Sequence, residues 1–146
     1  MVLFPLSTPF LHPADFFFDS AGVKIHYVVE GKGEPVLLIP GLGGDIQSSW
    51  PVIGELSKTF QVIALDNRGH GQSDKPHDPN SYGMNLVEDP IRLLDHLNIQ
   101  RAHVEGYSMG GAIVLAMLGF HPERLRTAVI GGAGWIPPEQ NGSSPI

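Results

Sequence analysis

Cysteine is absent from the 146 residues of this sequence, so the chain can form no disulfide framework, no thiolate metal site and no cysteine nucleophile. Whatever chemistry it performs must use oxygen and imidazole groups. Basic residues are also few, because nine Lys and Arg side chains stand against fifteen Asp and Glu side chains and leave a net charge of -6. A polyanionic phosphate backbone would be repelled on balance, so we expect no nucleic-acid partner.

Long hydrophobic runs and targeting features are absent as well. The longest apolar stretch, 109–120, is far shorter than the roughly 20 residues that span a bilayer, and glycines interrupt it. The segment 1–14 lacks the basic residues that open a signal peptide, and prolines break it repeatedly. We therefore expect no contact with a membrane and a cytoplasmic location.

Apolar segments with strand and helix character alternate along the chain. Strands are predicted at 25–30, 35–39, 61–65, 102–107 and 127–130, and helices at 50–56, 90–97 and 109–120. Asp89 and Pro90 have the residue types of an N-cap and of a first helical position, so we expect the second helix to begin there. Strand, helix and strand in repetition indicate parallel βαβ units, hence an α/β fold with a mostly parallel sheet and helices on both faces.

The sequence Gly-Tyr-Ser-Met-Gly at 106–110 matches the G-x-S-x-G nucleophile elbow, and it falls between a predicted strand and a predicted helix, as that motif requires. We therefore predict that Ser108 is a catalytic nucleophile with a strained, positive φ angle. The flanking glycines would let strand and helix approach closely, and the first N–H of the helix, that of Met109, would face a developing oxyanion. The alternative is an ordinary serine in a glycine-flanked turn.

A second glycine-rich turn, Pro-Gly-Leu-Gly-Gly at 40–44, follows the first predicted parallel strand. In this position it would supply another oxyanion donor, for which Leu42 is the candidate. A phosphate-binding loop is disfavoured, because the turn has no Gly-Lys-Ser/Thr ending and its glycines do not fit G-x-G-x-x-G. A purely structural turn remains an alternative, since glycines after a strand are common for steric reasons.

Together with Asp-Asn-Arg-Gly-His-Gly-Gln-Ser at 66–73, these turns form three motifs in order, each after a predicted strand. They resemble the α/β-hydrolase superfamily over about 22–135, which is most of the chain. The resemblance implies a nucleophile, an acid and a histidine on loops at one sheet edge, beside an oxyanion hole. It also implies that Asp66, Arg68 and His70 form a structural turn. A serine at 108 resembles the esterase, lactonase and carbon–carbon hydrolase branches, and not the dehalogenase and epoxide hydrolase branches.

Two residues depart from the pattern of this superfamily. Pro40 stands where many members carry histidine, which removes a hydrogen-bonding group but leaves the N–H of Leu42 available. Glu105 lies in a strand expected to be apolar on both faces, where an unpaired carboxylate is costly to bury. Gly43 and Trp135 are expected to line the substrate pocket, with simple core packing as the alternative for Trp135.

The acid and the histidine of a triad are missing from the expected places. In this fold both follow the serine along the chain, yet the only later histidine is His121. It lies at the far end of the predicted helix, roughly 20 Å from Ser108, and His121-Pro122 fits a helix end. We therefore expect the N-terminal half of a hydrolase, truncated after about the sixth strand.

The expected organisation is an N-terminal extension at 1–20, a partial hydrolase domain at 21–136 and a mobile tail at 137–146, where a missing lid would begin. An apolar strand at the sheet edge would favour self-association. The expected function is hydrolysis of a small ester, lactone or related acyl or carbon–carbon substrate, without metal or cofactor, by a chain that is inactive alone. A noncatalytic ligand-binding relative and a nucleotide-binding domain are the alternatives.

Overall fold

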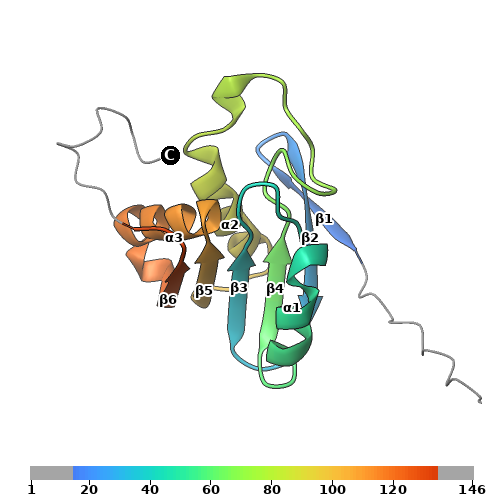
Figure 1. Ribbon diagram of the computed structural model, residues 1–146, viewed down its shortest axis with the longest axis vertical. Coiled ribbons are helices and arrows are strands. Elements are labelled where there is room, and N and C mark those ends of the chain that lie inside the picture. The colour runs from blue at the N-terminus through green and yellow to red at the C-terminus, as the bar shows by residue number, and fades with distance from the viewer. Residues whose placement is uncertain (1–14, 135–146) are drawn as a thin grey trace, which may run out of the picture.

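The computed structural model describes residues 15–134, which form a six-stranded sheet with helices on both faces (Figure 1). In chain order the strands are β1 (Phe16–Ser20), β2 (Val23–Glu30), β3 (Pro35–Ile39), β4 (Gln61–Leu65), β5 (Ala102–Tyr107) and β6 (Leu125–Gly131), and the α-helices are α1 (Trp50–Leu56), α2 (Asn85–His96) and α3 (Met109–Phe120). The tail expected at 137–146 lies outside the described residues.

The central strands run parallel to one another. Across the sheet the order is β1-β2-β4-β3-β5-β6; β3 pairs in parallel with β4 and β5, β5 pairs in parallel with β6, and the pairs β1–β2 and β2–β4 are antiparallel. Leu37 of β3 lies opposite Ile63 on one side and Val104 on the other, and all three side chains are buried. Parallel strands covered on both faces are apolar without alternation, as the sequence of these segments is. The predicted α/β fold with a mostly parallel sheet is confirmed.

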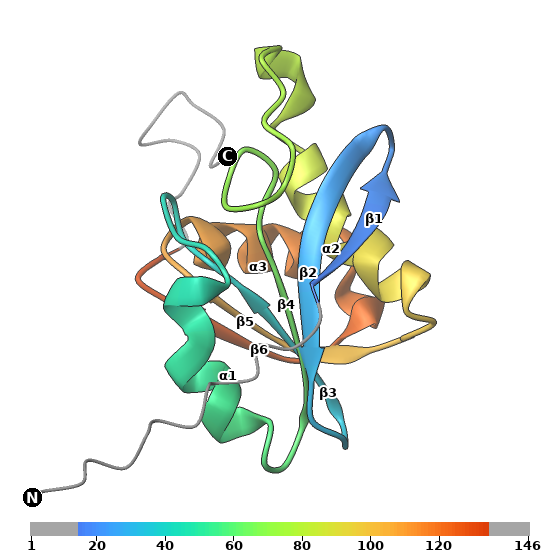
Figure 2. The same ribbon diagram turned by 90° about the vertical axis from the view of Figure 1, so that its right-hand side faces the viewer.

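One helix covers one face of the sheet and two helices cover the other (Figures 1 and 2). α1 buries Ile53 in a cluster with Val36 and Leu38 of β3, whereas α2 and α3 contribute to the larger cluster on the opposite face. The alternation of β3 side chains between the two clusters follows from the two-residue period of a strand. The loops that follow the parallel strands consequently emerge at one edge of the sheet, where the sequence carries its three motifs.

The sheet begins earlier than the sequence analysis predicted. β1 lies inside the segment 1–20 that was assigned to an extension, and it pairs with β2 in a hairpin. Phe18 is buried in the larger cluster, whereas the neighbouring Phe16 and Phe17 are exposed, and Phe16 stacks on Tyr27 with ring centroids 5.5 Å apart. Because three consecutive phenylalanines show no two-residue alternation, the sequence did not reveal which of them faces the core.

The expected start of the second helix at Asp89 and Pro90 is wrong. α2 begins at Asn85 and continues through Pro90 without a break, so Asp89 is an interior residue and no N-cap. Its carboxylate forms a buried bidentate ion pair with Arg68, Oδ2 accepting from Nε and Oδ1 from Nη2, each at 2.7 Å. Oδ1 also accepts from the hydroxyl of Ser20 at 2.5 Å.

A proline inside a helix costs about 3 kcal/mol or more, because it removes one hydrogen bond and crowds the preceding turn. Two gains offset this cost in α2. The helix turn before Pro90 buries Leu86 and Val87 in the core, and it directs Asp89 inward to the guanidinium of Arg68. The helix continues through Pro90 because long-range contacts outweigh a local preference, a frequent result in folded proteins.

Glu105 lies in an inner strand, because β5 is paired with β3 on one side and with β6 on the other. Its side chain is half-buried and forms no hydrogen bond or ion pair with any described residue. Burial raises the pKa of this carboxyl above its ordinary value of 4.5, because the charged form loses water contacts. A carboxylate therefore occupies a position where its charge is unfavourable at neutral pH.

β6 is the last strand in the order of the described sheet, and on one face of it Val129 is 58% exposed. The self-association expected from such an edge stays a prediction. In residues 15–134 no helix has the length and apolar character needed to cross a membrane.

Replacing Asp89 tests its role as a buried ion-pair partner. Asp89→Ala leaves the guanidinium of Arg68 buried without its partner, so we expect the free energy of unfolding to fall by about 3–5 kcal/mol. Removal of an N-cap would cost only about 1 kcal/mol. Asp78→Ala is the matched control, since the Asp78 side chain does accept a bond from the N–H of Asn80 at the start of a 3-10 turn. Urea unfolding followed by circular dichroism measures both losses, and equal losses would contradict the prediction.

The raised pKa of Glu105 makes stability depend on pH. The folded state binds this proton more tightly than the unfolded state, so the contribution is present below the unfolded pKa and is lost as pH rises through the folded pKa. Glu105→Gln should therefore have a higher Tm than the wild type at neutral pH, and the difference should shrink as pH falls to about 4. Calorimetry at both pH values measures it, with Glu55→Gln as an exposed control. A variant less stable than wild type at neutral pH would refute the prediction.

Candidate active site

Ser108 stands alone between the end of β5 and the start of α3. Its backbone has φ 53° and ψ −115°, so the predicted positive φ is confirmed. Non-glycine residues rarely adopt such angles, and where they do the surrounding structure must hold them in place. The turn therefore stores strain at the residue that the sequence marked as a nucleophile.

Glycines on both sides of Ser108 allow the close contacts that hold this turn. A Cβ atom on Gly106 would collide with the backbone of Gly110, and a Cβ atom on Gly110 would collide with the carbonyl oxygen of Ile39 in β3. The contacts are with backbone, so no side-chain movement would relieve them. The elbow therefore packs α3 directly against the ends of β5 and β3.

The backbone N–H and carbonyl of Ser108 both form hydrogen bonds, whereas its hydroxyl forms none with the described residues. Its N–H donates to the carbonyl of Gly131 at 2.7 Å, and its carbonyl accepts from the N–H of Ala112 at 3.0 Å, inside α3. Its side chain is exposed, and the hydroxyl forms no hydrogen bond with any described residue. Met109 is the first residue of α3, so its N–H is among those that lack an acceptor within the helix.

The glycine-rich loop after β3 approaches the elbow closely. A Cβ atom on Gly41 would lie 3.0 Å from the carbonyl oxygen of Tyr107 and 3.3 Å from the Cβ of Ser108. The loop is closed by a hydrogen bond of 3.0 Å from the N–H of Gly44 to the carbonyl of Gly41. Leu42 is therefore held one residue away from the point of contact with Ser108.

A cavity of about 470 Å³ opens beside the serine. It is lined by the loop residues Pro40, Gly41, Leu42, Gly43 and Gly44, by Leu38 and Ile39 of β3, by Ser48, Ser49 and Val52 near α1, and by Glu105, Tyr107 and Ser108. The structure thus brings together Ser108, Leu42 and Gly43, three of the residues selected from the sequence. Met109 lies beside them at the start of α3, and Trp135 lies outside the described residues.

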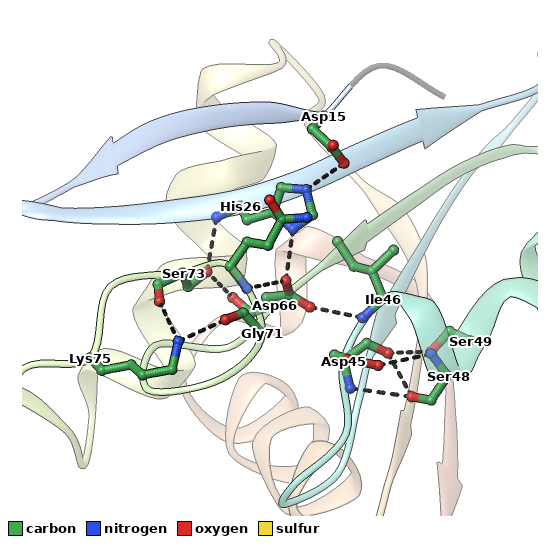
Figure 3. Close-up of polar contacts among 11 residues, drawn as sticks. Asp15, His26, Asp45, Ile46, Ser48, Ser49, Asp66, Gly71, Ser73 and Lys75 are labelled. Carbon is green, nitrogen blue, oxygen red and sulfur yellow. Dashed lines mark hydrogen bonds and ion pairs between the residues drawn. The ribbon is translucent and has the colours of Figure 1, made fainter. Parts of the chain in front are cut away.

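The motif after β4 has no contact with this cavity; its residues support the loops around it. Asp66 is buried, and its carboxylate accepts from the N–H groups of Ile46 and Gln72, each at 2.8 Å, and contacts Nδ1 of His26 at 2.7 Å. Figure 3 shows His26 between Asp66 and Asp15, with Nε2 of the ring 2.8 Å from Asp15. These contacts tie β2, the entrance to α1 and the loop after β4 together.

Asn67 is a residue that the sequence analysis did not select. Its Nδ2 donates to the carbonyl of Pro40 at 2.9 Å, across 27 positions of sequence. The only local indication was its place directly after Asp66 in the 66–73 motif, which does not identify a partner so distant in the chain.

No imidazole among the described residues is bonded to the hydroxyl of Ser108. His121 is the C-cap residue of α3, as predicted, and its Nε2 lies 2.7 Å from a carboxylate oxygen of Glu88 in α2. His26 and His103 are likewise engaged with carboxylates elsewhere in the structure. Within residues 15–134 there is also no group of three His, Asp or Glu side chains arranged to hold a metal ion.

Comparison with known proteins agrees with this geometry. A family model described as alpha/beta hydrolase fold matches residues 34–143. The chain is 35% identical over 120 residues to 2-hydroxymuconate semialdehyde hydrolase of Pseudomonas sp. (strain CF600), covering 80% of this chain and 42% of that protein. It is similar to the enol-lactonase from Burkholderia xenovorans LB400, with a TM-score of 0.73 and 33% identity, covering 77% of this chain and 44% of that one.

The epoxide hydrolase VrEH1 from Vigna radiata is also similar, with a TM-score of 0.81 and 26% identity, covering 85% of this chain and 41% of that one. The chain therefore spans less than half the length of the relatives that it matches. Its strand order, its elbow and the match of the family model agree, and the chain belongs to the α/β-hydrolase fold family.

Proposed function

We propose that this chain carries the nucleophile and the oxyanion donors of a serine hydrolase that acts on a small ester, lactone or related acyl or carbon–carbon substrate. The observation that carries the proposal is the conformation of Ser108, whose strained backbone presents an exposed hydroxyl to a cavity of about 470 Å³. Strained backbone conformations occur mainly at functional sites, and the reaction that suits an exposed serine hydroxyl is nucleophilic attack.

In the proposed reaction, the Ser108 oxygen attacks the carbonyl carbon of the substrate and a base takes the hydroxyl proton. Negative charge then develops on the former carbonyl oxygen. The N–H groups of Leu42 and Met109 would stabilise it, since one lies in the loop that contacts Ser108 and the other begins α3, where the helix dipole favours negative charge. Collapse of this intermediate expels the leaving group, and water releases the acyl group from the serine.

A serine nucleophile favours acyl substrates over epoxides. Attack on a carbonyl gives a serine ester, which water can cleave through the same oxyanion hole. Attack on an epoxide would give a serine ether, which offers no carbonyl carbon to water. The likeness to the epoxide hydrolase VrEH1 therefore concerns the fold, and Ser108 supports an acyl substrate.

The base and the acid of the proposed mechanism lie outside the described residues. Without an imidazole to accept its proton, Ser108 is a weak nucleophile at neutral pH. Oxyanion donors and binding alone retain only a small part of the acceleration in serine hydrolases. We therefore propose that the chain of 146 residues is a poor catalyst by itself.

Ester hydrolysis and active-site labelling test the proposal. The 146-residue chain should hydrolyse a short-chain p-nitrophenyl ester at close to the uncatalysed rate, yet an excess of fluorophosphonate should slowly modify Ser108, as detected by mass spectrometry. Ser108→Ala should abolish the modification. Ser49→Ala is the matched control, because Ser49 lines the same cavity and should leave the modification rate unchanged.

Two results would change the proposal. Turnover in the enzymatic range that disappears in Ser108→Ala would mean that a base is present within the chain. Absence of any modification at Ser108 would favour the alternative, a noncatalytic relative that binds a ligand in the cavity.

A further inference from the structure

Two adjacent side chains after β4 hold the two ends of the loop at 40–46. Asn67 donates from Nδ2 to the carbonyl of Pro40 at 2.9 Å, and Asp66 accepts at Oδ1 from the N–H of Ile46 at 2.8 Å. Asn67 is 1% exposed and Asp66 is 2% exposed, so water does not compete for either bond. The loop that carries Leu42 is therefore fixed from the neighbouring strand.

These bonds determine the directions of the peptide groups in the loop. The described residues contain no cis peptide bond, and in a trans peptide the N–H points opposite to the preceding carbonyl. The bond from Gly44 to the carbonyl of Gly41 thus directs the N–H of Leu42. One peptide earlier, the bond from Asn67 to Pro40 directs the N–H of Gly41.

Asn67 is held in an orientation that leaves its own carbonyl unused. Its Oδ1 is buried and has no hydrogen-bond partner among the described residues. Reversing the amide would not help, because Oδ1 would then face the carbonyl oxygen of Pro40, and two acceptors repel each other. A buried carbonyl without a partner lowers the free energy of unfolding, so the hydrogen bond from Nδ2 to Pro40 is kept at the expense of an unpaired Oδ1.

Pro40 explains why this donor is needed. Proline has no N–H, so its carbonyl is the only backbone polar group through which a hydrogen bond can hold it. That carbonyl belongs to the peptide unit entering Gly41, where an added Cβ atom would lie 3.3 Å from the Cβ of Ser108. A change at Pro40 would therefore be transmitted directly to the contact between the loop and the nucleophile.

We propose that Asn67 is a positioning residue of the active site. By holding the carbonyl of Pro40 it fixes the peptide that leads into Gly41, and so it fixes the place in the loop from which the following N–H, that of Leu42, faces the oxyanion. The inference rests on the proposed function, since it assigns Asn67 a role only if charge develops beside Ser108. Oxyanion donors act through their exact placement relative to that charge, and small displacements reduce their effect strongly.

Asn67→Leu tests this role, because leucine has a similar volume but no donor and no unpaired carbonyl. The amide resonances of Gly41 and Leu42 should shift in ¹H–¹⁵N spectra of the 146-residue chain, while Tm changes little. The rate at which excess fluorophosphonate modifies Ser108 should fall roughly tenfold. Asn80→Leu, at an exposed position in a 3-10 turn, should leave the modification rate and the Leu42 resonance unchanged.

Unshifted resonances of Gly41 and Leu42 in Asn67→Leu would overturn the proposal, and so would an unchanged modification rate. A lower Tm with an unchanged rate would assign Asn67 a purely structural role. If wild-type Ser108 is not modified at all, the proposed function fails, whereas the amide resonances still test the loop contact.

Asn67→Asp supplies a second variant should Asn67→Leu not fold. A protonated carboxyl can donate to the carbonyl of Pro40 and a carboxylate cannot, so the Leu42 resonance should move toward its wild-type position as pH is lowered. The modification rate relative to wild type should recover over the same pH range. A resonance and a relative rate that are independent of pH would contradict the role of the donor.

Discussion

Three consecutive buried side chains at the end of β4, those of Asp66, Asn67 and Arg68, fix the loops on which the candidate active site depends. Asp66 binds the backbone that enters α1 and the buried histidine of β2. Asn67 binds the loop after β3, and Arg68 binds the inner carboxylate of α2. The partners lie in β2, in the loop between β3 and α1, and in α2, so the segment after β4 connects the helices on the two faces of the sheet. Buried polar groups of this kind are stabilising only when their partners are present, which makes the arrangement specific to one set of loop positions.

Much of the fold could be predicted because the residues that determine each of these elements are neighbours in the sequence. The apolar runs of β3, β4 and β5 and the interrupted apolar run of α3 are continuous in sequence, and the structure has them at the predicted bounds. β1 escaped prediction because only one of its three phenylalanines faces the core. The start of α2 was wrong because Asp89 and Pro90 fit the pattern of a cap, while the decisive contact was a guanidinium 21 residues earlier in the chain.

In the candidate site, too, features determined by neighbouring residues could be predicted and features determined by distant contacts could not. The glycine spacing around Ser108 predicted its positive φ, because a tight turn between strand and helix is determined by the residues within it. The contact from Asn67 to Pro40 joins residues far apart in sequence, so no periodicity or motif identifies it. Glu105 was recognised as out of place, but whether it had a partner depended on the packing of β5 between its neighbours.

The hydrogen bond from the N–H of Ser108 to the carbonyl of Gly131 has a mechanical consequence. The backbone of the candidate nucleophile is tethered to the end of β6, and the chain leaves the described fold only three residues later, at Gly134. A displacement of the chain at this end of β6 would reach the strained turn directly, through this bond of 2.7 Å and through the pairing of β6 with β5. The opposite edge of the sheet, at β1, is separated from β5, the strand that ends before Ser108, by three intervening strands. The candidate nucleophile is therefore coupled more directly to the C-terminal side of the described fold than to its N-terminal side.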